Sequence, residues 1–155
     1  MKSVALDPLD AGSAASLAGM LGEPVLRASL FGGRGRINEE LAARLWSPIA
    51  GDDARWAVRC VDSGRVVGGI GVACEQVSMF VGTDFQGQGY GQASLAALLL
   101  LCQARGPWSV LNAWTVRGNR AARRVFQATG WRELGVCKQD RGMPTLVHYC
   151  SLPIR

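Results

Sequence analysis

Residues 77–93 read VSMFVGTDFQGQGYGQA, a sequence that predicts a strand, a glycine-rich turn and the start of a helix. Apolar residues fill the strand, and the Ala/Leu-rich stretch 92–103 predicts the helix. The glycines Gly87, Gly89 and Gly91 fall where main-chain N–H groups at the positive end of a helix lack partners. Because glycine lets an anion approach the main chain more closely than a Cβ allows, we expect a phosphate-binding loop.

Three phosphate-binding patterns compete for this loop. A Rossmann fingerprint needs a glycine where the chain has Gln92, and a P-loop needs a lysine that the loop lacks. The spacing Gln86-x-x-Gly89-x-Gly91 instead resembles the Q/R-x-x-G-x-G/A pattern by which the GNAT superfamily of acyltransferases holds the pyrophosphate of coenzyme A. For the loop alone, a glycine-rich turn without a ligand is the alternative.

A second motif occupies residues 119–131, directly after a predicted strand. It reads N-x-x-A-x-x-x-F-x-x-x-G-W and consists of Asn119, Ala122, Phe126, Gly130 and Trp131. It resembles the later motif of the same superfamily, N-x-x-A-x-x-x-(Y/F)-x-x-x-G-(F/W). Two motifs in register argue against a chance match, and the resemblance extends over about residues 55–152. The first fifty residues match only in being two helices after a strand.

The predicted elements follow the order β-α-α-β-β-β-α-β-α-β-β, which is typical of an α+β domain. We expect strands at residues 3–6, 55–61, 66–73, 75–81, 108–116, 131–138 and 145–152. We expect helices after Asp10 or Ser13, after Asn38, over 92–103 and after Asn119. The resemblance implies the GNAT, or acyl-CoA N-acyltransferase, fold: one domain over residues 1–155 whose mixed, largely antiparallel central sheet is flanked by helices.

The resemblance also implies acetyl-CoA as co-substrate, and no metal ion. In the family, the strand before the loop diverges from its neighbouring strand, and its free main-chain N–H groups, here around Phe80 and Val81, bind the thioester oxygen and the pantetheine amides. The expected contacts are Met79, Phe80, Val81, Gln86, Gly87, Gln88, Gly89, Tyr90, Gly91, Gln92, Asn119 and Phe126. For Asn119 a helix cap alone is the alternative. A cluster of arginines is either a solvated helix face or a contact with the 3′-phosphate; its members are Arg117, Arg120, Arg123 and Arg124.

Two residues are candidates for proton transfer, Glu75 and Tyr149. One branch of the family places its general base eleven residues before the glutamine of the first motif, which is the position of Glu75. Walled by neighbouring side chains, this carboxylate would accept a proton near neutral pH, whereas an exposed strand-end acid is the alternative. Phe126 stands where many relatives have a tyrosine as general acid, and it cannot donate a proton. Tyr149 is either the general acid or an ordinary strand aromatic. If it is not the acid, water protonates the leaving thiolate or no acid is needed. His148 is expected to be an ordinary residue of the sheet.

Composition sets the wider context. The formal net charge is +5, but acids are interleaved with the arginines, so we expect an anionic small ligand and no nucleic acid. The five cysteines form no CxxC pair and lie inside apolar stretches. We therefore expect free thiols that pack as small apolar side chains, in a reducing cytoplasm. The longest apolar run, residues 95–102, is far below membrane-spanning length, so we expect no membrane partner and no export.

The sequence therefore predicts an acetyl-CoA-dependent N-acetyltransferase whose acceptor is a primary amine on a small molecule or a peptide. Direct attack in a ternary complex is the expected mechanism. A non-catalytic acyl-CoA-binding regulatory domain is the alternative, because Phe126 leaves no obvious acid. Neither motif identifies the acceptor amine, and the sequence is compatible with a homodimer.

Overall fold

Seven strands form one sheet in the order β1-β2-β3-β4-β5-β7-β6. The computed structural model describes residues 2–26, 54–140, 142 and 144–154, so the helix expected after Asn38 lies outside the described residues. The strands are β1 Val4–Pro8, β2 Ala54–Cys60, β3 Val66–Ala73, β4 Gln76–Val81, β5 Asn112–Val116, β6 Arg132–Cys137 and β7 Leu146–Cys150. The helices are α1 Ala11–Leu21, α4 Tyr90–Arg105 and α5 Arg120–Ala128, with a short 3-10 turn η1 Thr83–Phe85.

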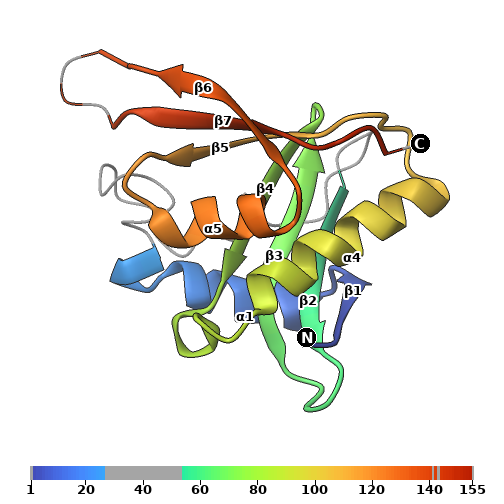
Figure 1. Ribbon diagram of the computed structural model, residues 1–155. Coiled ribbons are helices and arrows are strands. Elements are labelled where there is room, and N and C mark those ends of the chain that lie inside the picture. The colour runs from blue at the N-terminus through green and yellow to red at the C-terminus, as the bar shows by residue number, and fades with distance from the viewer. Residues whose placement is uncertain (1, 27–53, 141, 143, 155) are drawn as a thin grey trace.

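The strand pairing opens the sheet between β4 and β5. Neighbouring strands run antiparallel except β4 and β5, which are parallel and pair only at Gln76 and Asn112. At this end the Asn112 N–H donates to the Glu75 carbonyl over 2.8 Å. Beyond it the two strands spread apart (Figure 1). We call this opening the strand split; it confirms the predicted divergence of the strand before the glycine loop from its neighbour.

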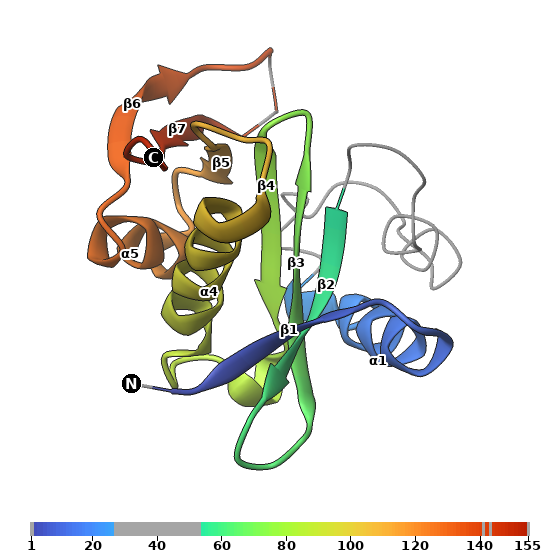
Figure 2. The ribbon, with the colours of Figure 1, turned by 90° about the vertical axis from the view of Figure 1, so that its right-hand side faces the viewer.

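Helices cover both faces of the sheet, as the sequence predicts. Helices α4 and α5 lie on one face, and α1 lies on the other (Figure 2). The larger apolar core lies between the sheet and α4 and α5; its fully buried members include Ile70, Leu95, Leu98, Leu111, Val147 and Tyr149. A smaller cluster between the sheet and α1 contains Leu17, Leu21, Leu26, Ala57 and Phe80.

The helix starts follow the capping signals in the sequence. Asp10 and Ser13, the two expected caps of α1, act together: the Ser13 N–H donates to the Asp10 carboxylate over 2.7 Å, and the Asp10 N–H donates to the Ser13 hydroxyl over 3.0 Å. Asn119 caps α5, since its Oδ1 accepts a hydrogen bond from the Ala122 N–H over 3.1 Å. Gly130, with φ of 80°, follows α5 in the left-handed conformation expected of it.

Three element boundaries differ from the predicted ones. Strand β5 begins at Asn112 instead of residue 108, because Leu111 N–H donates to the Ser151 side chain and the Ser151 N–H donates back to the Leu111 carbonyl. Strand β4 begins at Gln76, after a two-residue turn. Helix α4 begins at Tyr90, two residues before the expected start. In the described ranges no helix has both the length and the apolar character needed to cross a membrane.

The five cysteines are free thiols. Cys60 and Cys102 are buried and pack as small apolar residues, as expected. Cys74 and Cys137 are exposed, so the expectation that every cysteine lies in an apolar environment is wrong. The reason is local: Cys74 lies in the turn before β4, and Cys137 lies on β6, whose residues are all exposed.

Candidate active site

The glycine loop, residues 86–91, presents a row of free donors. Gly87 and Gly89 have φ of 72° and 90°, and Gly89 is the N-cap of α4. Among the described residues, nothing accepts a hydrogen bond from the main-chain N–H groups of residues 87–92; the first helical bond runs from the Ala93 N–H to the Gly89 carbonyl. Because these six N–H groups have no acceptor in the described structure and lie at the positive end of a 16-residue helix, the loop is the candidate site for an anion.

Two glutamines fix the shape of this loop. The Gln86 side-chain amide donates to the Val81 carbonyl over 3.1 Å, and that of Gln88 donates to the Asp84 carbonyl over 2.9 Å. Gly91 also has a packing role that the sequence reasoning did not predict. A Cβ at this position would lie 3.2 Å from a methyl carbon of Val125, so its lack of a side chain lets α4 pack closely on α5.

One edge of β4 faces the strand split. Gly82 N–H donates to the Val67 carbonyl on β3, and the register pairs Phe80 with Gly69. In an antiparallel pair successive residues alternate in the direction of their main-chain groups. Phe80 therefore directs its N–H toward β3, whereas Met79 and Val81 direct theirs into the strand split. Val81 thus meets the predicted geometry of a donor in the split, and Phe80 does not.

Side chains on β4 alternate in the same way. Met79 and Val81 pack against the larger core, and Phe80 packs in the smaller cluster on the α1 face. The Phe80 side chain therefore lies on the opposite face of the sheet from α4 and α5.

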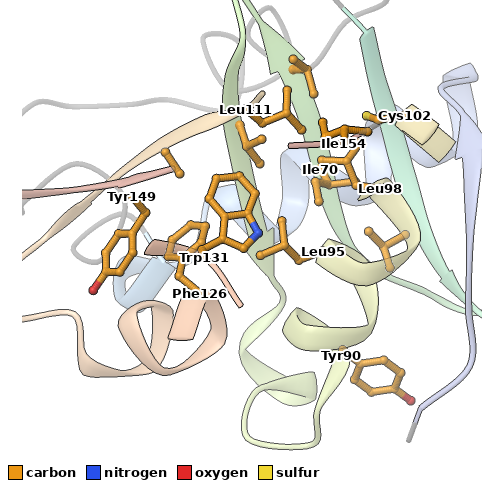
Figure 3. Packing of buried hydrophobic residues seen from close by; sticks show 14 of the residues in the cluster. Ile70, Tyr90, Leu95, Leu98, Cys102, Leu111, Phe126, Trp131, Tyr149 and Ile154 are labelled. Carbon is orange, nitrogen blue, oxygen red and sulfur yellow. The ribbon is translucent and has the colours of Figure 1, made fainter. Parts of the chain in front are cut away.

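Two of the predicted cofactor contacts, Tyr90 and Phe126, have side chains in the core. Tyr90 is 6% exposed and donates to the Cys60 sulfur over 3.4 Å. Hydrogen bonds from Ser63 and Tyr90 lower the pKa of the Cys60 thiol to about 7. Phe126 is 4% exposed and packs between Tyr149 and Trp131, with ring centroids 4.9 Å and 5.2 Å away (Figure 3). What Tyr90 offers to a ligand is its free main-chain N–H.

Glu75 differs from its expected surroundings. It lies with Cys74 in the two-residue turn between β3 and β4, both residues have positive φ, and its side chain is exposed. The expectation that neighbouring side chains wall this carboxylate is wrong, because Glu75 lies in the tight turn at the ends of the inner strands β3 and β4, where its side chain is exposed. Its position at the closed end of the strand split follows from the hydrogen bond between its carbonyl and Asn112.

Tyr149, the predicted acid, is fully buried and its hydroxyl has two partners. The hydroxyl accepts from the Arg123 guanidinium over 3.2 Å and donates to the Glu133 carboxylate over 3.1 Å. Burial raises the pKa of the Tyr149 hydroxyl, and the Glu133 carboxylate acts in the same direction against the opposing effect of Arg123. These contacts connect β7, α5 and β6. Of the two roles that the sequence allows for Tyr149, general acid or ordinary strand aromatic, they fit the second.

The face of the strand split away from α4 and α5 carries a cluster that the sequence reasoning did not assemble. Ala113 and Val147 are buried in the larger core, so their neighbours along β5 and β7 point to the opposite face. There Trp114 and His148 stack at a centroid distance of 4.2 Å, and His148 Nε2 lies 2.9 Å from Asn112 Oδ1. The alternation along β5 indicates that Asn112 and Trp114 share a face of the sheet. Their contact with His148 could not be predicted, because it depends on the register between β5 and β7, and His148 is 36 residues from Asn112 in the sequence.

A pocket of about 480 Å³ lies elsewhere, beside η1 and α1. None of its lining residues comes from β5 or β7, so it is separate from the strand split. Two of its charged groups have partners: Arg59 pairs with Asp7 at 2.5 Å, and Glu23 accepts a hydrogen bond from the Thr83 hydroxyl. Within the described part of the chain, no group of three or more His, Cys, Asp or Glu side chains is placed to hold a metal ion.

Comparisons with known proteins agree on one family. A family model described as the acetyltransferase (GNAT) family matches residues 28–131. No curated protein matches the chain in sequence.

Solved structures extend the similarity to the whole fold. A spermidine N-acetyltransferase from Vibrio cholerae, in complex with CoA and spermine, superimposes with a TM-score of 0.83 at 11% identity, over 97% of this chain and 96% of that one. An acetyltransferase from Salmonella typhimurium that modifies the N-terminal serine of a 50S ribosomal subunit protein gives 0.79 at 18%, over 98% and 96%. An aminoglycoside acetyltransferase in complex with coenzyme A gives 0.77 at 14%, over 96% and 94%.

Proposed function

This chain belongs to the GNAT family of acetyltransferases, and on that basis we propose that it transfers an acetyl group from acetyl-CoA to a primary amine by direct attack in a ternary complex. The observation that carries the proposal is the row of six unpaired N–H groups at residues 87–92, at the end of β4 that borders the strand split. The acceptor amine belongs to a small molecule or to a peptide.

The glycine loop fits the pyrophosphate of coenzyme A. Diphosphate oxygens accept several hydrogen bonds at once, and the N–H groups of residues 87–92 together with the α4 dipole supply donors and positive potential. A Cβ at Gly87 would meet no protein atom within 4 Å, so the space beside this main chain is open to a ligand. Within the arginine cluster, Arg123 is held by Tyr149 and Glu133. The exposed candidates for a 3′-phosphate contact are then Arg117, Arg120 and Arg124.

The strand split fits an extended arm with amide groups. Because β5 leaves β4 after Gln76, the main-chain N–H groups of Met79 and Val81 face the opening, where an added strand would pair with them. When bound there, acetyl-CoA supplies an activated thioester. The protein orients the thioester oxygen toward an N–H group of β4 and so stabilises the charge that develops on it.

Two proton transfers accompany the reaction, one from the attacking amine and one to the leaving thiolate, and in this proposal only the first uses a side chain. The attacking amine must lose a proton, and Glu75 at the closed end of the strand split is the carboxylate that receives it through water. No acid from α5 or β7 is required: Phe126 has no hydroxyl, and that of Tyr149 is engaged by Arg123 and Glu133. The leaving thiolate is a stable anion close to neutral pH, so water suffices to protonate it.

A thiol-release screen tests this function. The purified chain is incubated with acetyl-CoA and a panel of monoamines, polyamines, aminoglycosides and N-terminal peptides, and free coenzyme A is detected with a thiol reagent. We expect amine-dependent release with at least one class and acetylated product by mass spectrometry. Binding of acetyl-CoA without release from any class would favour the alternative, a non-catalytic acyl-CoA-binding regulatory domain.

A further inference from the structure

Trp114 is exposed where an inner strand normally hides its aromatic residues. Strand β5 lies between β4 and β7, yet the Trp114 side chain belongs to the exposed large apolar residues, with 41% of its surface accessible. This exposure accompanies the strand split: β4 and β5 pair only at Gln76 and Asn112, so Trp114 has no paired residue on β4 among the described strands. A large exposed aromatic surface beside an expected reaction site is an informative departure from ordinary burial.

The His148 ring and the Asn112 side chain fix the position of the indole. The His148 ring stacks on it at 4.2 Å between centroids and 5° between planes. His148 Nε2 lies 2.9 Å from Asn112 Oδ1, within hydrogen-bond distance, so the Asn112 side chain holds the imidazole in place. Asn112 is in turn anchored to the turn before β4 through its main-chain N–H. We call Trp114 and His148 the aromatic plate.

The sequence positions on the two strands place this plate on the far side of the strand split from β4. Gln76 and Asn112 form the single pair between β4 and β5, and the two strands diverge beyond it. Trp114 lies two residues past this pair on β5, and Met79, whose N–H faces the strand split, lies three residues past it on β4. One residue of a strand rises about 3.3 Å. Counted along the strands from their common pair, Trp114 and the Met79 N–H therefore differ by one residue, and they border the strand split from opposite sides.

We propose that the aromatic plate forms one wall of the acceptor site and selects primary amines that carry a flat aromatic ring on a short linker. This inference rests on the proposed acetyl transfer. Trp114 already stacks almost parallel on the His148 ring, and the accessible 41% of its surface is where a second flat ring can stack. An indole also attracts cations, but the chain carries a formal net charge of +5, which favours a neutral ring over a second ammonium group.

Three amines of matched size test the proposal: 2-phenylethylamine, 2-cyclohexylethylamine and a linear diamine. Wild-type protein and Trp114→Leu are compared by thiol release and by calorimetric titration of each amine into the protein loaded with coenzyme A. We expect the wild type to favour the phenyl amine over the cyclohexyl amine, and Trp114→Leu to lower that preference about 2- to 10-fold. Trp114→Phe should retain part of the preference.

The controls distinguish a failure of the proposed amine selectivity from a failure of the proposed acetyl transfer. Leu100→Ala, at a residue of α4 that is 66% exposed, should leave both the amine preference and acetyl-CoA affinity unchanged. Three results would overturn the proposal and leave the proposed acetyl transfer intact. The wild type would acetylate the phenyl and cyclohexyl amines equally well, or Trp114→Leu would keep the wild-type preference, or the protein would prefer the diamine in a way that depends on Trp114. A wild type that binds no acetyl-CoA would overturn both.

Discussion

Replacing Phe126 by alanine separates a core role of this ring from a role in cofactor binding. The side chain is 4% exposed and stacks on Tyr149 with an angle of 19° between the ring planes, while Trp131 covers its other flank. Truncating a packed phenylalanine costs about 3 to 5 kcal/mol. In a chain of this size each kcal/mol lowers the melting temperature by about 2 to 4 °C, so we expect a decrease of roughly 6 to 20 °C.

The assay pairs urea denaturation with calorimetric titration of coenzyme A at a temperature where both proteins are folded. We expect the Phe126→Ala protein to bind coenzyme A within a few fold of the wild type, because the ring offers little surface to a ligand. Leu134→Ala, at a residue of β6 that is 51% exposed, is the control and should change stability by no more than about 0.5 kcal/mol. An unchanged midpoint together with a large loss of affinity would refute this reasoning and assign the ring to the cofactor.

Three further changes test other parts of the site. Gly89→Val should lower coenzyme A affinity by an order of magnitude or more, because φ of 90° strains valine by about 1–2 kcal/mol and the new side chain crowds the loop. Calorimetry measures the affinity, and an unchanged value would contradict the proposed anion site. Glu75→Gln should keep acetyl-CoA affinity and lower turnover on the order of 10²-fold, with a loss that shrinks as pH rises, whereas a pH-independent loss or none excludes Glu75 as proton acceptor. Tyr149→Phe should cost about 1 to 3 kcal/mol of stability and keep turnover; lost turnover with binding intact would place an acid on β7. Since folding raises the pKa of the Tyr149 hydroxyl, the wild type should lose stability as pH rises above about 10, where the unfolded chain ionises first, and the phenylalanine variant should lack this part of the loss.

The glycine loop and the helix caps could be predicted because their signals are local. Gly89 needs a positive φ as the N-cap of α4, and Asn119 accepts a hydrogen bond three residues along the chain. Both facts follow from residue type and short spacing. The divergence of β4 from β5 was predicted from the family resemblance, and the single pair between Gln76 and Asn112 confirms it.

The environments of Glu75, Phe126 and Trp114 could not be predicted in this way. The turn at Glu75 needs positive φ at two residues that are neither glycine nor asparagine, so the sequence carries no signal for it. Whether Phe126 faces the core or a ligand depends on Tyr149 and Trp131, which come from later elements. The exposure of Trp114 depends on the path of β4, a property of the whole sheet.

The most direct test of the anion site is an NMR titration of the ¹⁵N-labelled protein with coenzyme A. The unpaired N–H groups of residues 87–92 should show the largest shift changes in the spectrum, and they should respond to the diphosphate part of the ligand alone at higher concentration. Main-chain signals of Met79 and Val81 should shift only with the complete arm. Binding of coenzyme A that leaves the amides of residues 87–92 unshifted would contradict the account.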